Sequence, residues 1–265
     1  MGLRLAGTVM QIADAIKDFP RDYADDYFNV RPIGQRYVAE QHPTETVALE
    51  LATALQRVLR NWGAGRRGAP QLRKEQEIAA ALLDTSLHSD VTKLSLFSIT
   101  NLGFDHRFRR LVNGTHSSEV LEDFDMRLLS VLRSFSDLVF LDNTNVTYPM
   151  KALLLVSGLM PALDSQVRTG LGIAGLKGVN KTQFLLPEDM RGSDAKKLTR
   201  LPFLLGQCWA DYSAQFQDGA RQANAAALIQ EPGRIFDILL FMQARKEKLP
   251  LLIFDAGRQP WYDLP

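Results

Sequence analysis

Residues 140–172 read FLDNTNVTYPMKALLLVSGLMPALDSQVRTGLG, and this stretch decides the fold prediction. Residues 141–149 are rich in Asn and Thr and end in proline, which is typical of a turn. Met150–Met160 is apolar nearly all round, which predicts a buried helix. Pro161 predicts the start of a short helix, and Asp164 predicts the start of a further, polar helix. We therefore expect a helix end, a turn, a buried helix and a second helix, in that order.

Helical periodicity extends on both sides of this stretch. In Thr46–Trp62 and Ser117–Phe140 apolar residues recur every three or four positions, which predicts amphipathic helices. Only the segment Pro250–Asp255 resembles a strand, and a strand needs a partner. Four further segments are predicted to be helical: Leu72–Leu87, Asp90–Ile99, Leu201–Leu228 and Gly233–Lys248. The sequence therefore predicts a mainly α fold, a bundle of roughly 8–10 helices with a short C-terminal extended segment.

The stretch GAGRRGAP at residues 63–70 interrupts the helical pattern and predicts a flexible basic loop. A chain of 265 residues suits one or two domains. We expect a single compact domain over residues 1–265. The loop leaves open a division of that domain into two lobes, residues 1–70 and 71–265.

The composition excludes several classes of protein. The chain has no run of the roughly 20 apolar residues that a membrane helix needs, so we expect no membrane-spanning segment. Its single cysteine, Cys208, excludes a disulfide framework and a multi-cysteine metal site. The near-absence of cysteine predicts a reduced, cytoplasmic compartment. The four histidines lack metal-ligand spacing, so we expect no metal and no cofactor. The oligomeric state is not predictable from these features.

The near-neutral net charge of +1 hides an uneven distribution. Residues 60–74 contain five bases and no acid, whereas residues 119–142 contain six acids and two bases. Residues 168–200 contain seven bases and three acids. Such blocks can be ordinary solvated faces. They can also place a basic surface on one side of the fold, where it attracts a polyanion.

Two glycine motifs suggest a nucleotide site on weak grounds. Residues 170–175 match the pattern GxGxxG, but the preceding residues 164–169 are polar rather than a hydrophobic strand. Residues 175–182 resemble a phosphate-binding loop, except that Asn180 stands where the last glycine belongs. The same residues also suit a hairpin turn that contacts a DNA phosphate, because Asn tolerates the left-handed conformation. A helix end and a basic loop are the simpler interpretations.

The stretch 140–172 resembles the core of the helix-hairpin-helix DNA glycosylases. In that family a lysine near the start of one helix and an aspartate at the start of the next face a flipped nucleotide. The resemblance implies that Asp164 is the catalytic carboxylate and that Lys151 is the amine nucleophile. Two features depart from the family pattern: the hairpin lacks its glycines, and the spacing from Lys151 to Asp164 is shorter than usual.

The chemistry of N-glycosidic bond cleavage suits these two side chains. Cleavage builds positive charge on the sugar, which a carboxylate stabilises, while a buried amine can attack the sugar carbon. The apolar neighbours of Lys151 would lower its pKa if the side chain were buried. The structural alternative is that Lys151 extends to solvent and that Asp164 only caps a helix.

The sequence also offers candidate contacts to DNA. Tyr148 is an aromatic ring on which a base can stack, and arginines follow Phe104 closely. The candidates are Asn143, Asn145, Tyr148, Arg107, Arg109, Arg110, Arg168, Lys177 and Lys181. We therefore expect a DNA-binding, glycosylase-like enzyme that acts in repair or in defence against foreign DNA. The alternative is a non-catalytic helical module that binds nucleic acid or protein.

Overall fold

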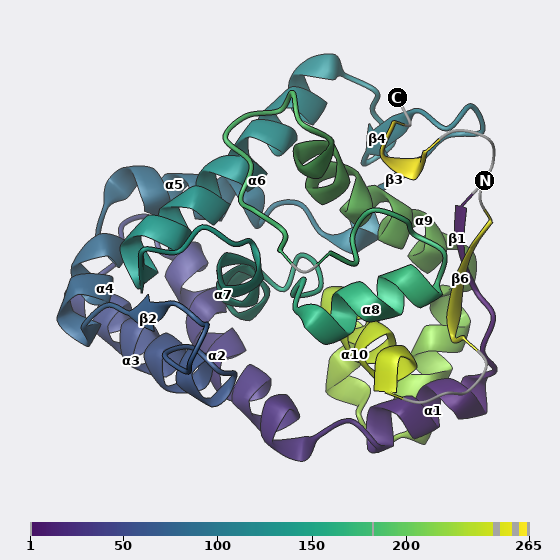
Figure 1. Ribbon diagram of the computed structural model, residues 1–265, viewed down its shortest axis with the longest axis horizontal. Coiled ribbons are helices and arrows are strands. Elements are labelled where there is room, and N and C mark those ends of the chain that lie inside the picture. Colours follow the sequence, from purple (N-terminus) through teal and green to yellow (C-terminus); the bar gives the residue numbers. More distant parts are fainter. Residues whose placement is uncertain (1, 182, 246–249, 256–259, 264–265) are drawn as a thin grey trace.

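The structure is a computed structural model that describes residues 2–181, 183–245, 250–255 and 260–263. It is 63% helical, with ten α-helices in the part of the chain that it describes. The strands there form three small antiparallel sheets of two strands each. The mainly α fold predicted from the sequence is confirmed (Figure 1).

Six consecutive helices form the first of two groups. Helix α3 shows why these residues fold as they do: the Thr44 hydroxyl accepts the N–H of Val47 at the helix start, and the apolar stripe from Val47 to Leu59 is buried. Helices α2 and α3 pack on each other and on α7. The group consists of α2 (Arg21–Ala39), α3 (Glu45–Asn61), α4 (Glu75–Leu82), α5 (Thr85–Leu94), α6 (Ser118–Val139) and α7 (Thr147–Ser157).

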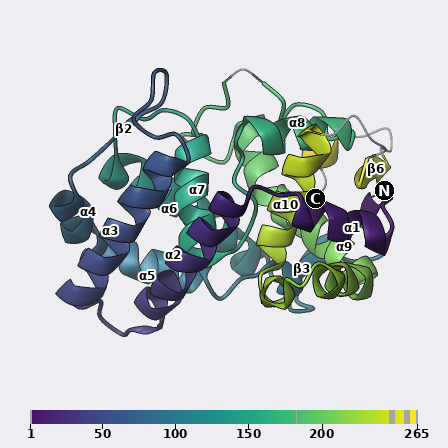
Figure 2. The same cartoon turned by 90° about the horizontal axis from the view of Figure 1, so that it is seen from below.

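The second group contains the remaining four helices: α1 (Val9–Lys17), α8 (Ser165–Ile173), α9 (Ser193–Gln222) and α10 (Pro232–Arg245). Helix α1 packs on α9 and α10, so the first residues of the chain lie with its last helices. The two groups lie side by side (Figure 2). The helices are thus grouped differently from the lobes 1–70 and 71–265 that the sequence left open. One continuous hydrophobic core joins the two groups.

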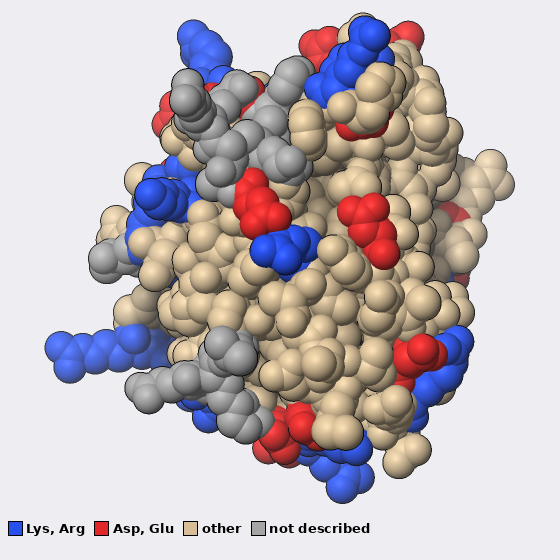
Figure 3. Space-filling view, turned by 90° about the vertical axis from the view of Figure 1, so that its right-hand side faces the viewer, with Lys and Arg blue, Asp and Glu red and all other residues tan. Residues whose placement is uncertain are grey.

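Strand β6 (Leu252–Asp255) is the extended segment predicted near the C-terminus. It pairs antiparallel with β1 (Gly2–Leu5), with Gly2 opposite Asp255 and Leu5 opposite Leu252. The face of the molecule over these strands is largely uncharged, with acidic and basic side chains scattered singly or in small clusters (Figure 3). The part of this face that the structure describes therefore carries no continuous basic patch.

The predicted order of elements in residues 140–172 is confirmed. Helix α6 ends at Val139, a turn follows, α7 begins at Thr147, and Asp164 is the N-cap of α8. Helix α7 ends because Gly158 adopts a left-handed conformation, with φ of 68°, while its N–H bonds to the carbonyl oxygen of Leu154. The prediction of a short helix that starts at Pro161 is wrong. Residues 161–163 are not helical, and the Ala162 N–H donates instead to Asp237.

Other predicted boundaries need correction. The helices predicted over Leu72–Leu87 and Asp90–Ile99 are observed with other bounds: α4 ends at Leu82 and α5 covers Thr85–Leu94. The Asp84 carboxylate accepts the N–H of Leu87 and starts α5 before the predicted boundary. Helix α9 begins eight residues before the predicted Leu201 and is kinked at Tyr212. Residues 246–248 of the last predicted helix lie outside the described residues.

The short hairpin of β3 (Leu102–Phe104) and β4 (Arg110–Val112) and the two-stranded pair of β2 (Gln71–Leu72) and β5 (Phe140–Leu141) were not predicted. Strands of two or three residues leave no alternation of polar and apolar residues to detect. Helices α1 and α2 were not predicted either. No described helix combines the length and the apolarity that crossing a membrane requires.

Helices α8 and α10 approach each other closely at Gly170. A Cβ atom at this position would lie 2.0 Å from the backbone oxygen of Leu240. Only glycine permits this approach, because the obstacle is backbone rather than a movable side chain. The contact fixes α8, and with it Asp164, against α10.

Candidate active site

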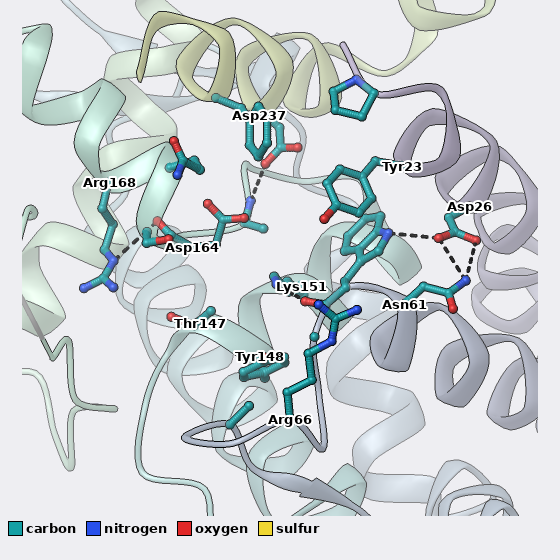
Figure 4. A pocket seen from close by; sticks show the side chains of 18 of the residues that line it. Tyr23, Asp26, Asn61, Arg66, Thr147, Tyr148, Lys151, Asp164, Arg168 and Asp237 are labelled. Atoms are coloured by element: carbon teal, nitrogen blue, oxygen red, sulfur yellow. Dashed lines mark hydrogen bonds between the residues drawn. The ribbon is translucent and has the colours of Figure 1, made fainter. Parts of the chain in front are cut away.

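A cavity of about 1410 Å³ opens between the two groups of helices. We call it the central cavity (Figure 4). Its lining comes from five separate parts of the chain and from Gln183: residues 19–26, 61–70, 145–151, 162–168 and 234–245. Both Lys151 and Asp164 belong to this lining, so the structure brings the two predicted catalytic residues to one cavity.

Lys151 lies in the second turn of α7 and is 7% exposed. Its amine donates a hydrogen bond of 2.7 Å to the carbonyl oxygen of Trp62 and lies 4.8 Å from the centre of the Tyr148 ring. Burial lowers the pKa of Lys151, and Arg66 acts in the same direction, while Asp164 and Asp237 partly oppose them. The structure therefore excludes the alternative in which this side chain extends to solvent.

Asp164 has two roles in this structure. One carboxylate oxygen, Oδ1, accepts the N–H of Val167 at 2.9 Å and caps α8. Among the described residues no hydrogen bond to the second oxygen, Oδ2, is present, and the side chain lines the central cavity. The sequence posed helix capping and a cavity position as alternatives, and the structure shows both. A capping bond to one oxygen leaves the other free to face a ligand.

Asp237 is a buried carboxylate of the cavity lining, and sequence analysis missed it. It lies in α10 and is 5% exposed. Burial raises its pKa to about 6, and nearby Asp164 acts in the same direction against the opposing charge of Arg234. The available signal was a single acid within the apolar run of residues 235–242, which is unusual for a buried helix.

Aromatic rings form one side of the cavity. Tyr23 meets the rings of Trp62 and Phe241 edge-on, with centroids 5.9 Å and 6.2 Å apart. The indole N–H of Trp62 donates to Asp26 at 3.1 Å, which fixes the orientation of the ring. The sequence predicts Tyr148 as a stacking ring but gives no such signal for Tyr23 and Phe241. These rings provide flat apolar surface next to the Lys151 amine.

Three arginines are part of the cavity lining near the loop 63–70 and helix α8. Arg66 and Arg67 lie in the predicted loop 63–70, are exposed, and form no ion pair with a described residue. Arg168 lines the cavity from α8 and donates to the carbonyl oxygen of Lys181 at 2.6 Å. The exposed guanidinium groups of Arg66 and Arg67 suit a phosphate or another anion, whereas Arg168 is buried.

The structure divides the candidate DNA contacts into two sets. Asn145, Tyr148 and Arg168 line the central cavity together with Lys151 and Asp164. Asn143 lies nearby but holds the turn together, since its amide donates to Ser136 Oγ and to the carbonyl oxygen of Asn145 at 2.8 Å each.

The remaining candidates are not in the cavity lining. Arg110 is buried and forms a two-point ion pair with Asp125, so its charge does not reach the surface. Arg109 binds Asp105 in the same hairpin, with exposed Arg107 beside it. Lys181 forms an ion pair of 2.6 Å with Asp194, while Lys177 is exposed. Residues 170–181, the described part of the glycine motifs, thus form a helix end and a basic loop.

No family model, curated protein or solved structure matches the chain. Within the described residues, no cluster of three or more His, Cys, Asp or Glu side chains could hold a metal ion. The chemistry of the cavity therefore has to be inferred from its own side chains. These include the buried amine of Lys151, aromatic rings, arginines and five carboxylates, namely Asp22, Asp25, Asp26, Asp164 and Asp237.

Proposed function

We propose that this protein acts on DNA and cleaves the N-glycosidic bond of a nucleotide turned out of the base stack. The observation that carries the proposal is that Lys151 and Asp164 line one cavity, with the amine buried and its pKa lowered. A lowered pKa increases the fraction of uncharged amine, which is the nucleophilic form. The resemblance of residues 140–172 to the helix-hairpin-helix glycosylases supports the same two roles.

The reaction assigns a distinct task to each side chain. As the C1′–N bond breaks, its electron pair leaves with the base and positive charge develops on the sugar. The ionised Asp164 stabilises that charge. Either the Lys151 amine or a water molecule forms the new bond to C1′, and the departing base takes up a proton. Attack by the amine would leave a covalent link between the sugar and Lys151.

The size and lining of the cavity favour a polymer over a small metabolite. Its volume of about 1410 Å³ exceeds the roughly 300–1,000 Å³ of pockets for small ligands. It has room for a nucleotide together with part of its backbone. The rings of Trp62 and Tyr148 offer stacking surface, and the exposed Arg66 and Arg67 offer contacts to phosphate.

The direct test is base release from DNA. The purified protein is incubated with oligonucleotides that carry alkylated, oxidised or deaminated bases, in single-stranded and duplex form, and free base is measured by mass spectrometry. We expect release from at least one substrate, and a loss of orders of magnitude in Asp164→Asn with DNA binding retained. Asparagine caps helices as well as aspartate does, so folding should be unchanged.

A matched control is available in α5. Asp84 caps that helix through the N–H of Leu87 at 2.9 Å, the same bond that Asp164 makes, but Asp84 is not in the cavity lining. Asp84→Asn should release base at the wild-type rate. Wild-type release by Asp164→Asn would end the proposed mechanism. DNA binding without release from any substrate would favour the non-catalytic binding module instead.

A further inference from the structure

The Asp237 carboxylate accepts two buried hydrogen bonds beside the central cavity. Its Oδ1 accepts the N–H of Ala162 at 3.0 Å, and its Oδ2 accepts a guanidinium N–H of Arg234. Arg234 in turn donates to the carbonyl oxygen of Tyr23 at 2.6 Å. One carboxylate therefore connects α10 with the segment before α8 and, through Arg234, with the start of α2.

The bond to Ala162 bears directly on Asp164. Ala162 precedes Asp164 by two residues, and the Asp164 N–H donates to the carbonyl oxygen of Ala162 at 2.8 Å. This segment is not helical, so it lacks the regular bonds that would fix it by itself. Asp237 supplies a fixed acceptor for one of its N–H groups, and the position of the Asp164 carboxylate depends on that anchor.

Asp237 also acts on Lys151 through its charge. Figure 4 shows Lys151, Asp164 and Asp237 around the same cavity, each from a different part of the chain. Both carboxylates raise the pKa of Lys151 and so oppose the lowering effect of burial. Lys151 is also faced by Arg66 and the ring of Tyr148, and Asp237 by Arg234 and Asp164.

We infer that Asp237 is a positioning residue of this site, which anchors the backbone that presents Asp164 and adds a second negative charge opposite Lys151. The inference rests on the proposed function, because it assigns Asp237 a part in the same reaction. It also makes a statement about Lys151 that holds without any substrate. The two can therefore be tested separately.

The test compares wild type with Asp237→Asn. Asparagine keeps an oxygen that can accept the Ala162 N–H, but it removes the charge. In protein labelled with ¹³C and ¹⁵N, NMR titration of the lysine Cε and Nζ signals follows Lys151, which is assigned by its loss in Lys151→Met. We expect Lys151 to titrate at lower pH in Asp237→Asn. The acid limb of the pH profile for base release should move to lower pH as well, since the Lys151 amine then loses its proton at lower pH.

Asp14→Asn is the control, because Asp14 is an exposed carboxylate that is not in the cavity lining. It should leave the titration of Lys151 and the pH profile unchanged. A purely structural role for Asp237 would reduce the rate in Asp237→Asn without moving either curve. An unchanged titration of Lys151 in a folded Asp237→Asn protein would overturn the inference.

A reciprocal measurement covers the case in which Asp237→Asn does not fold. Coupling between two titrating groups acts equally on both, so removing the Lys151 charge must raise the pKa of Asp237. The ¹³Cγ signal of Asp237 is titrated in wild type and in Lys151→Met, and an unchanged midpoint would refute the coupling. If this coupling is found but the wild type releases no base, the proposed function fails and the relationship between Asp237 and Lys151 stands.

Discussion

The amine of Lys151 donates a hydrogen bond of 2.7 Å to the backbone carbonyl oxygen of Trp62, which lies 89 residues earlier in the chain. This bond holds the amine at the cavity wall, directly beside the start of the basic loop 63–70. A neutral amine can make the same bond as an ammonium group, because both are hydrogen-bond donors. Loss of the proton from Lys151 therefore does not require the side chain to leave its place.

Lys151 should form a trapped covalent adduct with DNA. If its amine attacks the sugar, borohydride reduction will fix the intermediate as a stable complex that gel electrophoresis separates from free DNA. Lys151→Gln should abolish the complex. Adduct formation should increase as the pH rises through the lowered pKa of Lys151, because the uncharged form attacks.

Lys197 provides the control for the trapping experiment. It is also a buried lysine, 4% exposed, but it forms an ion pair of 2.9 Å with Asp194 and is not in the cavity lining. Lys197→Gln should still give the adduct. An adduct that persists in Lys151→Gln would exclude Lys151 as the nucleophile. Base release without any adduct would instead identify water as the nucleophile.

Arg66 and Arg67 should carry a salt-dependent part of the affinity for DNA. Each phosphate contact that is lost should reduce the slope of log K against log salt by about 0.9 for duplex DNA. The double variant Arg66→Ala and Arg67→Ala should bind more weakly and with a flatter slope, as measured by fluorescence anisotropy. Arg36→Ala should bind as the wild type does, because Arg36 pairs with Glu50 outside the cavity. An unchanged slope in the double variant would show that Arg66 and Arg67 are not part of the DNA-binding surface.

Gly170→Ala should destabilise the protein by about 1–3 kcal/mol or more, because the added Cβ has no room against the backbone of Leu240. Denaturant unfolding measures this loss. Gly172→Ala on the same helix is the control, since its Cβ would meet only the exposed side chain of Asn180 at 3.3 Å. Alanine is also the better helix former, so Gly172→Ala should be neutral or slightly stabilising. Equal stability of the two variants would contradict the close approach of α8 and α10.

Asp105 should stabilise the hairpin of β3 and β4 in a pH-dependent way. Desolvation raises the pKa of Asp105, but hydrogen bonds from Arg109 and Arg107 together outweigh it and lower the pKa to about 2. The stabilisation is therefore present above about pH 4 and is lost as the pH falls through 2. Asp105→Asn should melt below the wild type at pH 7, and the two melting temperatures should converge near pH 2. Asp218→Asn, which alters an exposed ion pair, should change the melting temperature little at either pH.

The sequence predicted the elements that depend on local signals. The turn before α7, the buried helix itself and the cap at Asp164 each follow from residue types within a few positions of one another. Helix α2 was missed because it is polar and contains Pro32, which ordinarily breaks a helix. Long-range packing of α2 against α3 and α7 outweighs these local preferences.

The candidate site was predictable only in part. Lys151 and Asp164 are 13 residues apart, and the resemblance of that one stretch was enough to pair them. Asp237 and Tyr23 come from α10 and α2, and nothing in their own neighbourhoods indicates that they share a cavity. Arg110 was predicted to contact DNA, but it is buried and paired with Asp125. A sequence alone does not distinguish a surface arginine from a buried one. Burial is a property of the whole fold.

The lining of the central cavity extends from Phe19 to Arg245, and it includes residues from both groups of helices. Neither group of helices forms the cavity alone. Separating the two groups would open the cavity and move Lys151 away from Asp237. A molecule bound there would link the two groups, and its binding free energy would add to the stability of the entire native state. Ligand binding in the cavity and global folding are therefore thermodynamically linked. A rise in melting temperature would report binding even when no reaction follows.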